Sequence, residues 1–179
     1  YWKDFKETFS FMAHGSLEQF KTKNNLYYVA PAAGSLWYSF ENDKKISDRE
    51  RAKSLNTTVK YIGEMGVLLS FPVIPVTMYS FGLKNQNVHQ VQFAKEFMAS
   101  LYLALIESNF ISQINIHARP DQKELSPWET KFRGRSSFPS GHVVPYATLM
   151  FKGFQFYGAK VAVPAAVLTY FSCMQRVRS

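Results

Sequence analysis

One long stretch of the sequence repeats its apolar residues at helical spacing, and this stretch constrains the fold more than any other feature. It runs from Val88 to about Ile116, and its apolar residues step by three and four: Val91, Ala94, Met98, Leu101 and Leu105. Such a stripe is the buried face of an amphipathic helix. Pro120 cannot continue the helix, and the residue before a proline is biased away from helix. Arg119 is therefore expected where this helix gives way to a loop.

Shorter helices are predicted on the N-terminal side of this stretch. Apolar spacing favours a helix over residues 2–12, ended by Gly15, and a second over 29–41 with Pro31 in its first turn. The polar residues 41–56 are expected to form a short exposed helix and turns.

The segments next to the long stretch carry helix caps and prolines. Asn56 or Thr57 is expected to cap a helix that runs toward Gly63 and Gly66. Residues 67–81 form an apolar segment kinked by two prolines, and Asn85 to Asn87 mark a turn.

The C-terminal third is predicted to be a loop followed by two helices. Residues 121–139 are polar and irregular, while 142–157 and 160–177 have helical character and are separated near Gly158. No segment sustains the alternation of a strand. The sequence therefore predicts a single all-α domain over residues 1–179.

Composition narrows the class of protein. Hydrophobic residues make up 46% of the 179, which excludes a disordered chain. The net charge of +8 favours anionic partners such as phosphate esters, acidic lipid headgroups or nucleic acid. The sharpest basic cluster, Lys131, Arg133 and Arg135, lies in a predicted loop rather than along a helix. This placement favours a small anionic group over nucleic acid.

The cysteine content argues against a disulfide-linked or thiolate-metal protein, and the hydropathy argues against an integral membrane protein. A single cysteine, Cys173, excludes an internal disulfide and a thiolate metal cluster, and its apolar surroundings indicate an ordinary buried thiol. A membrane span needs about 20 mostly apolar residues, and the runs 67–81 and 161–174 are shorter. We expect a soluble domain with a membrane surface among its candidate partners, rather than an integral membrane protein.

The tetrapeptide Pro139-Ser140-Gly141-His142 precedes a predicted helix and has the composition of a phosphate cradle. The first N–H groups of a helix lack intrahelical partners, and the helix dipole adds positive potential there. Glycine lets an anion approach the backbone, serine adds a donor, and histidine can deliver a proton near neutral pH. The alternative is that Ser140 caps the helix and His142 is a packed polar residue.

Two arginines accompany this motif at helix ends. Arg119 closes the long helix, and Arg176 lies at the far end of the last one. Permanently charged, planar guanidinium groups suit the oxygens of a phosphoryl group, although a single arginine is more often a surface residue.

Together these residues resemble the type 2 phosphatidic acid phosphatase superfamily, which includes bacterial class A acid phosphatases and vanadium-dependent haloperoxidases. Its pattern is Lys-x6-Arg-Pro, then Pro-Ser-Gly-His, then Ser-Arg-x5-His-x3-Asp. Arg119-Pro120 matches the end of the first part and residues 139–142 match the second completely. Gln175-Arg176-Val177 is similar to the opening of the third part. The resemblance covers about residues 60–179, so that 1–59 are an N-terminal extension.

The resemblance implies a multi-helix bundle of the acid phosphatase and haloperoxidase type, with a metal-independent phosphatase reaction. A histidine would attack phosphorus, His142 would protonate the leaving oxygen, and four groups would hold the phosphate: Arg119, Ser140, Gly141 and Arg176. The substrate would be a phosphate monoester, whether a lipid phosphate, an isoprenoid diphosphate or a soluble ester. No cofactor is implied, apart from vanadate as a phosphate mimic or haloperoxidase cofactor. Family members commonly face the periplasm or the outer side of a membrane, which favours a periplasmic or membrane-associated location.

The chain departs from the family pattern at three positions. Gln175 replaces the family's serine, and Ser112 stands where its first lysine should fall. That phosphate contact is therefore expected either to be missing or to be supplied by Lys123 or Lys131. The family's nucleophilic histidine and its aspartate fall beyond Ser179, so we expect residues 1–179 alone to bind phosphate-like anions but to turn over poorly.

Two other functions stay open, a vanadate-dependent haloperoxidase and a non-catalytic phosphate-binding module. His14 and His89 are expected to be exposed, and His117 to have a structural or solvent-facing role.

Overall fold

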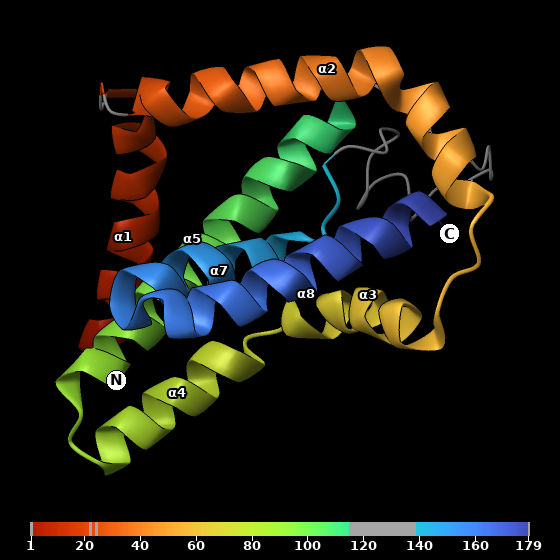
Figure 1. Ribbon diagram of the computed structural model, residues 1–179. Coiled ribbons are helices and arrows are strands. Elements are labelled where there is room, and N and C mark those ends of the chain that lie inside the picture. The colour runs from red at the N-terminus through yellow and green to blue at the C-terminus, as the bar shows by residue number, and fades with distance from the viewer. Residues whose placement is uncertain (1, 22, 24, 115–138, 179) are drawn as a thin grey trace.

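The computed structural model describes residues 2–21, 23, 25–114 and 139–178. This part of the chain contains seven helices and no strand, which confirms the all-α class (Figure 1). The helices are α1 (Trp2–Lys21), α2 (Asn25–Arg51), α3 (Thr57–Leu69), α4 (Val73–Lys84), α5 (Val88–Gln113), α7 (Val144–Tyr157) and α8 (Ala159–Arg178).

The core lies along α5, where the other helices meet. Phe93, Phe97 and Leu101 are its buried centre, spaced four residues apart on one face of the helix. Side chains of α4 and α7 pack around them. The predicted stripe is thus right for Ala94 and Leu101, which are buried. It left out the two phenylalanines, which are the largest fully buried side chains in the described part.

The two N-terminal helices are longer than the sequence predicted. Gly15 does not end α1, which continues to Lys21, and Gly15 instead faces Leu103 of α5. Pro31 lies inside α2 rather than in its first turn, and the polar residues predicted to be turns extend that helix to Arg51. The prediction of helix ends from glycine and polar composition was wrong at both places.

Caps and turns around α3, α4 and α5 agree with the sequence. The side chain of Asn56 accepts a hydrogen bond of 2.8 Å from the Thr58 N–H and so caps α3. The chain bends after Leu69, and Pro75 lies in the first turn of α4, where no intrahelical N–H bond is lost. The predicted turn before α5 contains Gln86 at φ 53°, and Asn87 then caps α5.

The helices α7 and α8 form a hairpin beside α5, and α3 lies against α8 (Figure 1). Gly158, at φ 69°, joins the two helices of the hairpin. A Cβ on Gly153 would lie 2.6 Å from the side chain of Val161, which shows how closely they approach. In Figure 1, α2 runs along the outside of the molecule and meets α8 near its C-terminal end, where Arg178 pairs with Glu50 at 2.8 Å.

Candidate functional site

The Pro-Ser-Gly-His segment is a turn that leads into α7. Gly141 to Val143 form the turn, and the N–H of Val143 donates to the Ser140 carbonyl at 3.1 Å. The helix begins at Val144, two residues later than the sequence predicted, because this turn comes first. Val143 is the N-cap and no side chain caps the helix, so the interpretation of Ser140 as a cap is wrong.

The turn is held by its backbone, through the carbonyl of His142. A Cβ on Gly66 of α3 would lie 2.2 Å from that carbonyl oxygen, so only glycine leaves room for it. The hydroxyl of Ser172 on α8, which is 0% exposed, donates to the same oxygen over 3.4 Å. This arrangement fixes the turn between α3 and α8 through the backbone of His142, whose side chain is half-buried.

Further contacts join α3 to the same region. Tyr146 on α7 donates to the Ile62 carbonyl of α3 at 2.6 Å. Gln175 on α8 packs on Gly63, where a Cβ would lie 2.5 Å from its side chain. Gln175 is 6% exposed, and its Oε1 accepts no hydrogen bond within the described structure. A buried acceptor of this kind is costly unless a donor reaches it.

Arg176 is brought to this region by the periodicity of α8. It follows Ser172 by four residues, so the two share a face of the helix and lie about one turn apart. Arg176 is exposed, as is Gly141, where an added Cβ would meet nothing within 4 Å. The structure therefore leaves open space beside Gly141 and places an arginine one turn from the anchor of the turn.

The electrostatics here favour an anion. The start of α7 presents the positive end of its dipole, although Pro145 lacks the N–H that another residue would add. Arg178 is engaged by Glu50, whose pKa lies below its usual value because Lys53 and then Arg178 donate hydrogen bonds to it. No acidic residue occurs in α7 or α8.

Ser112, at the position of the family's lysine, is buried near the end of α5. Its hydroxyl donates to the Asn109 carbonyl at 2.7 Å, so the side chain satisfies its own helix rather than a ligand. Arg119, His117 and the basic residues 123, 131, 133 and 135 lie outside the described residues.

The remaining singled-out residues lie away from the turn. His14 is exposed inside α1 and hydrogen bonded to the Ser10 carbonyl. His89 is exposed and packs edge-on against Phe156 and Tyr157. The prediction of a buried thiol was wrong, since Cys173 is exposed.

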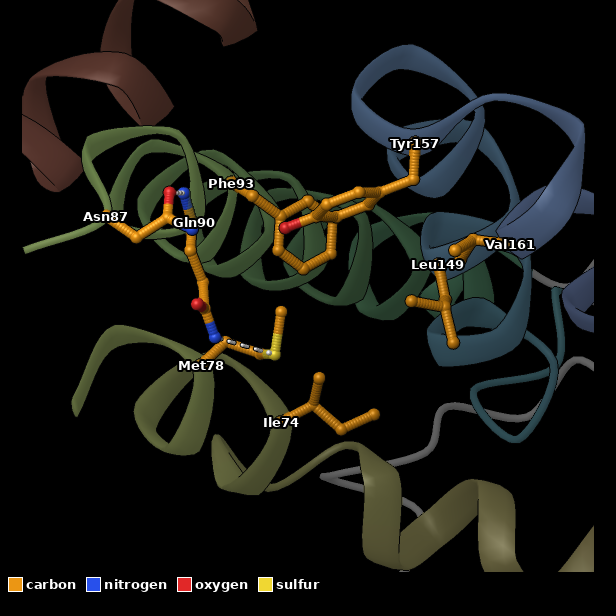
Figure 2. Close-up of a pocket in the computed structure, with 8 residues that line it drawn as sticks. All are labelled: Ile74, Met78, Asn87, Gln90, Phe93, Leu149, Tyr157 and Val161. Atoms are coloured by element: carbon orange, nitrogen blue, oxygen red, sulfur yellow. Dashed lines mark hydrogen bonds between the residues drawn. The ribbon is translucent and has the colours of Figure 1, made fainter. Parts of the chain in front are cut away.

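An apolar pocket of about 380 Å³ lies between α4, α5, α7 and the start of α8 (Figure 2). Figure 2 shows Ile74 and Met78 of α4 facing Phe93 and Leu149 across it. None of the residues that line this pocket belongs to the turn at residues 139–143. It contains no cluster of acids, bases or nucleophiles.

Sequence reasoning missed the residues that hold the turn, namely Gly63, Gly66, Tyr146 and Ser172. The available signal was a pair of glycines, Gly63 and Gly66, inside α3, because a helical residue without a Cβ lets another segment approach closely. The segment that approaches these glycines is far from them in the sequence, and a single sequence does not reveal such a long-range contact.

Comparisons with protein-family models, with curated proteins and with solved structures found no match. Within the described residues, no group of three or more His, Cys, Asp or Glu could hold a metal ion.

Proposed function

We propose that the turn at residues 139–143 binds a phosphate-type oxyanion, as part of a metal-independent phosphatase of phosphate monoesters. The observation that carries the proposal is the anchoring of the His142 carbonyl between Gly66 and Ser172. Ser172, which contacts this carbonyl, precedes Arg176 by one helical turn on α8. The order of these residues supports the resemblance to the type 2 phosphatidic acid phosphatase superfamily.

The chemistry follows from these positions. In the reaction that the resemblance implies, a histidine attacks phosphorus in line, and the bond from phosphorus to the ester oxygen breaks. His142 gives a proton to the departing alkoxide, and water then cleaves the phosphohistidine. Arg119, Arg176, the Ser140 hydroxyl and the Gly141 N–H hold the phosphoryl oxygens, because preorganised donors supply most of the stabilisation in phosphoryl transfer. The overall bundle is proposed to be of the acid phosphatase and haloperoxidase type.

A non-catalytic phosphate-binding module is the second candidate. Ser112 favours it, because this buried hydroxyl is used by the Asn109 carbonyl where the family has a phosphate-binding lysine. In both candidates the anion occupies the same site, so binding and catalysis are tested separately.

Binding is tested by titrating the chain with phosphate and with vanadate in a calorimeter. Arg176→Gln is expected to weaken binding by about tenfold to a hundredfold, the effect of losing one or two hydrogen bonds to a charged group. Lys160→Gln is the matched control, since it removes one exposed positive charge from the other end of α8. An equal loss in both variants would show that net charge alone attracts the anion.

Catalysis is tested with the natural protein, including whatever sequence follows Ser179, on a generic phosphate ester. His142→Gln is expected to slow release of the leaving alcohol while phosphate binding persists. Binding without hydrolysis in the natural protein would favour the non-catalytic module, and halide oxidation with bound vanadate would indicate a haloperoxidase.

A further inference from the structure

Among the described residues, large apolar side chains are more often exposed than buried. Twenty-nine large hydrophobic residues are exposed in the described part, whereas the buried hydrophobic residues number eight and include four alanines. Seven buried residues are polar or charged. A water-soluble bundle has the reverse distribution, since burial of large apolar groups is what drives its folding.

Inside the bundle, the helices meet through glycine. A Cβ would come within 3 Å of a neighbouring segment at each of four helical glycines, namely Gly63, Gly66, Gly82 and Gly153. Close approach through small residues, reinforced by polar bonds, is how helices associate where the surrounding medium is itself apolar.

Helix α1 has its polar face inward and its aromatic face outward. Asp4 and Glu7 pair with Lys95 of α5, which is 8% exposed. On the outer side, Trp2, Phe5 and Phe9 form an exposed ladder of rings, with centroids 5.5 and 4.8 Å apart. This orientation stabilises the helix only if something apolar covers the ladder.

The α3–α4 segment carries the longest uncharged run among the described helices. No charged residue occurs from Met65 to Leu83, and most large side chains there are exposed. No single described helix has the length and apolar composition of a membrane span, whereas the pair α3 and α4, with a bend of 65° between them, has that length and composition when taken together.

A groove of about 300 Å³ runs along the outer side of the α7–α8 hairpin. Its lining is entirely of alanine, valine, methionine and phenylalanine, and Phe151, Phe154 and Val163 are 60–68% exposed. All four charged residues of these helices are basic: Lys152, Lys160, Arg176 and Arg178. Lys152 pairs with Glu96 and Arg178 with Glu50, whereas Lys160 is exposed at the start of α8. An apolar surface beside this lysine, on a chain of net charge +8, is complementary to anionic lipid, whose headgroups attract basic residues.

We propose that the exposed apolar faces of α1, α3, α4, α7 and α8 contact the hydrocarbon of a lipid bilayer containing anionic lipid. The inference replaces the expectation of a domain surrounded by water. It does not depend on the oxyanion site, because none of its observations involves phosphate.

The first experiment is flotation of the chain with vesicles of phosphatidylcholine and of equimolar phosphatidylcholine and phosphatidylglycerol. The chain is expected to float with both, more completely with the second, and to stay bound in high salt. Phe154→Glu is expected to lower the partition coefficient by about tenfold or more, the effect of an acidic side chain placed in hydrocarbon. Ile46→Glu, the same kind of change on the charged half of α2, is expected to have no effect.

The second experiment locates the contact. In a chain whose native tryptophans are replaced by phenylalanine, Phe154→Trp is expected to be quenched by lipids brominated on their acyl chains. Ile46→Trp in the same background is expected to be quenched much less. Circular dichroism of each variant verifies that the helices persist.

Two results would overturn the proposal. One is a chain that stays in solution as a defined oligomer or protein complex without floating, since protein would then cover the apolar faces. The other is equal quenching at residues 154 and 46. Neither result bears on phosphate binding, so this inference and the proposed function fail independently.

Discussion

At the scale of single residues, two glycines near the turn have opposite surroundings. Gly66 faces the His142 carbonyl so closely that a methyl group would overlap it, whereas Gly141 faces open space. Gly66 is thus required by packing, and nothing in the packing requires Gly141. Gly66 therefore belongs to the packing that holds the turn, whereas Gly141 lies where the proposed ligand would approach the turn.

Gly66→Ala is expected to destabilise the protein by about 1–3 kcal/mol, the usual cost of forcing a methyl group into a packed contact. A new Cβ would lie 2.2 Å from the His142 oxygen, so α3 or the turn must move. Chemical denaturation followed by circular dichroism measures the change. Gly34→Ala is the control, because that exposed glycine of α2 has nothing within 4 Å and alanine there should stabilise by about 0.5–1 kcal/mol. Equal effects at both positions would contradict the contact.

Gly141→Ala is expected to leave the free energy of unfolding within about 0.5 kcal/mol of the parent, as for a surface substitution. Its φ is not in the left-handed region, and the added methyl group meets no neighbour. Vanadate binding is nevertheless expected to weaken severalfold, because the methyl group occupies the approach to the backbone. Unchanged vanadate affinity, measured by the same calorimetry, would remove Gly141 from the site.

The residues of the candidate motif could be recognised from the sequence, but the residues that hold the motif in place could not. Ser140, Gly141 and His142 stand together because they are consecutive, and Arg176 is recognisable as a charged residue at a helix end. The contacts of the His142 carbonyl come from helices that are far from it in the sequence. Local patterns carry no information about such pairs.

At the scale of elements, Asn56 connects the cap of α3 to the site, because α3 carries the glycines on which the turn rests. Asn56→Ala is expected to cost about 1 kcal/mol of stability through loss of the 2.8 Å bond to the Thr58 N–H. Asn56→Asp keeps a hydrogen-bond acceptor at this position and is expected to retain most of the stability that the cap contributes. Thermal unfolding of the three proteins checks this, and equal midpoints would mean that the cap contributes nothing.

The contact between α2 and α8 is expected to depend on pH through Glu50. Its pKa is lowered from the ordinary 4.5 by hydrogen bonds from Lys53 and Arg178. A lowered folded-state pKa means that the contribution to stability is present above about pH 4.5 and is lost as pH falls through the folded value.

Glu50→Gln is therefore expected to have a flatter profile of unfolding midpoint against pH between neutrality and pH 3. Glu41→Gln, at an exposed carboxylate of the same helix, is the control and should keep the parent's slope. Parallel profiles for the parent and Glu50→Gln would contradict the role of the ion pair.

The presence of a helix was easier to predict than the residues at which it begins and ends, and Gly15 and Pro31 show why. Each weakens a helix locally, yet α1 and α2 continue through them. For α1, packing against α5 outweighs the preference of one glycine, whose cost in a helix is about 1 kcal/mol. The cap at Asn56 was predictable because its hydrogen bond is made to a residue only two positions away.

At the scale of the whole molecule, ion pairs join the helices in addition to the apolar core along α5. Lys152 of α7 pairs with Glu96 of α5 at 2.9 Å, and Lys95 joins α5 to α1. Apolar periodicity predicted that helices would pack, but it predicted large side chains inside. It could not reveal which medium surrounds the bundle, because a helical stripe does not say which of its faces is outward.

The role of ion pairs between helices can be tested where α1 is attached to α5 through Lys95. Lys95→Met removes the ammonium group from Asp4 and Glu7, and is expected to cost about 1–3 kcal/mol, because partly buried carboxylates lose a charged donor. Tyr79 still donates to Asp4 at 2.7 Å, which limits the loss. The triple variant that also carries Asp4→Asn and Glu7→Gln is expected to recover much of the stability, since removing all the charges leaves none uncompensated. Lys3→Met, an exposed lysine on α1, should change stability by less than about 0.5 kcal/mol. If Lys95→Met alone were neutral in denaturant unfolding, apolar burial rather than this charge cluster would hold α1 on α5, and the inward polar face would have lost its physical reason.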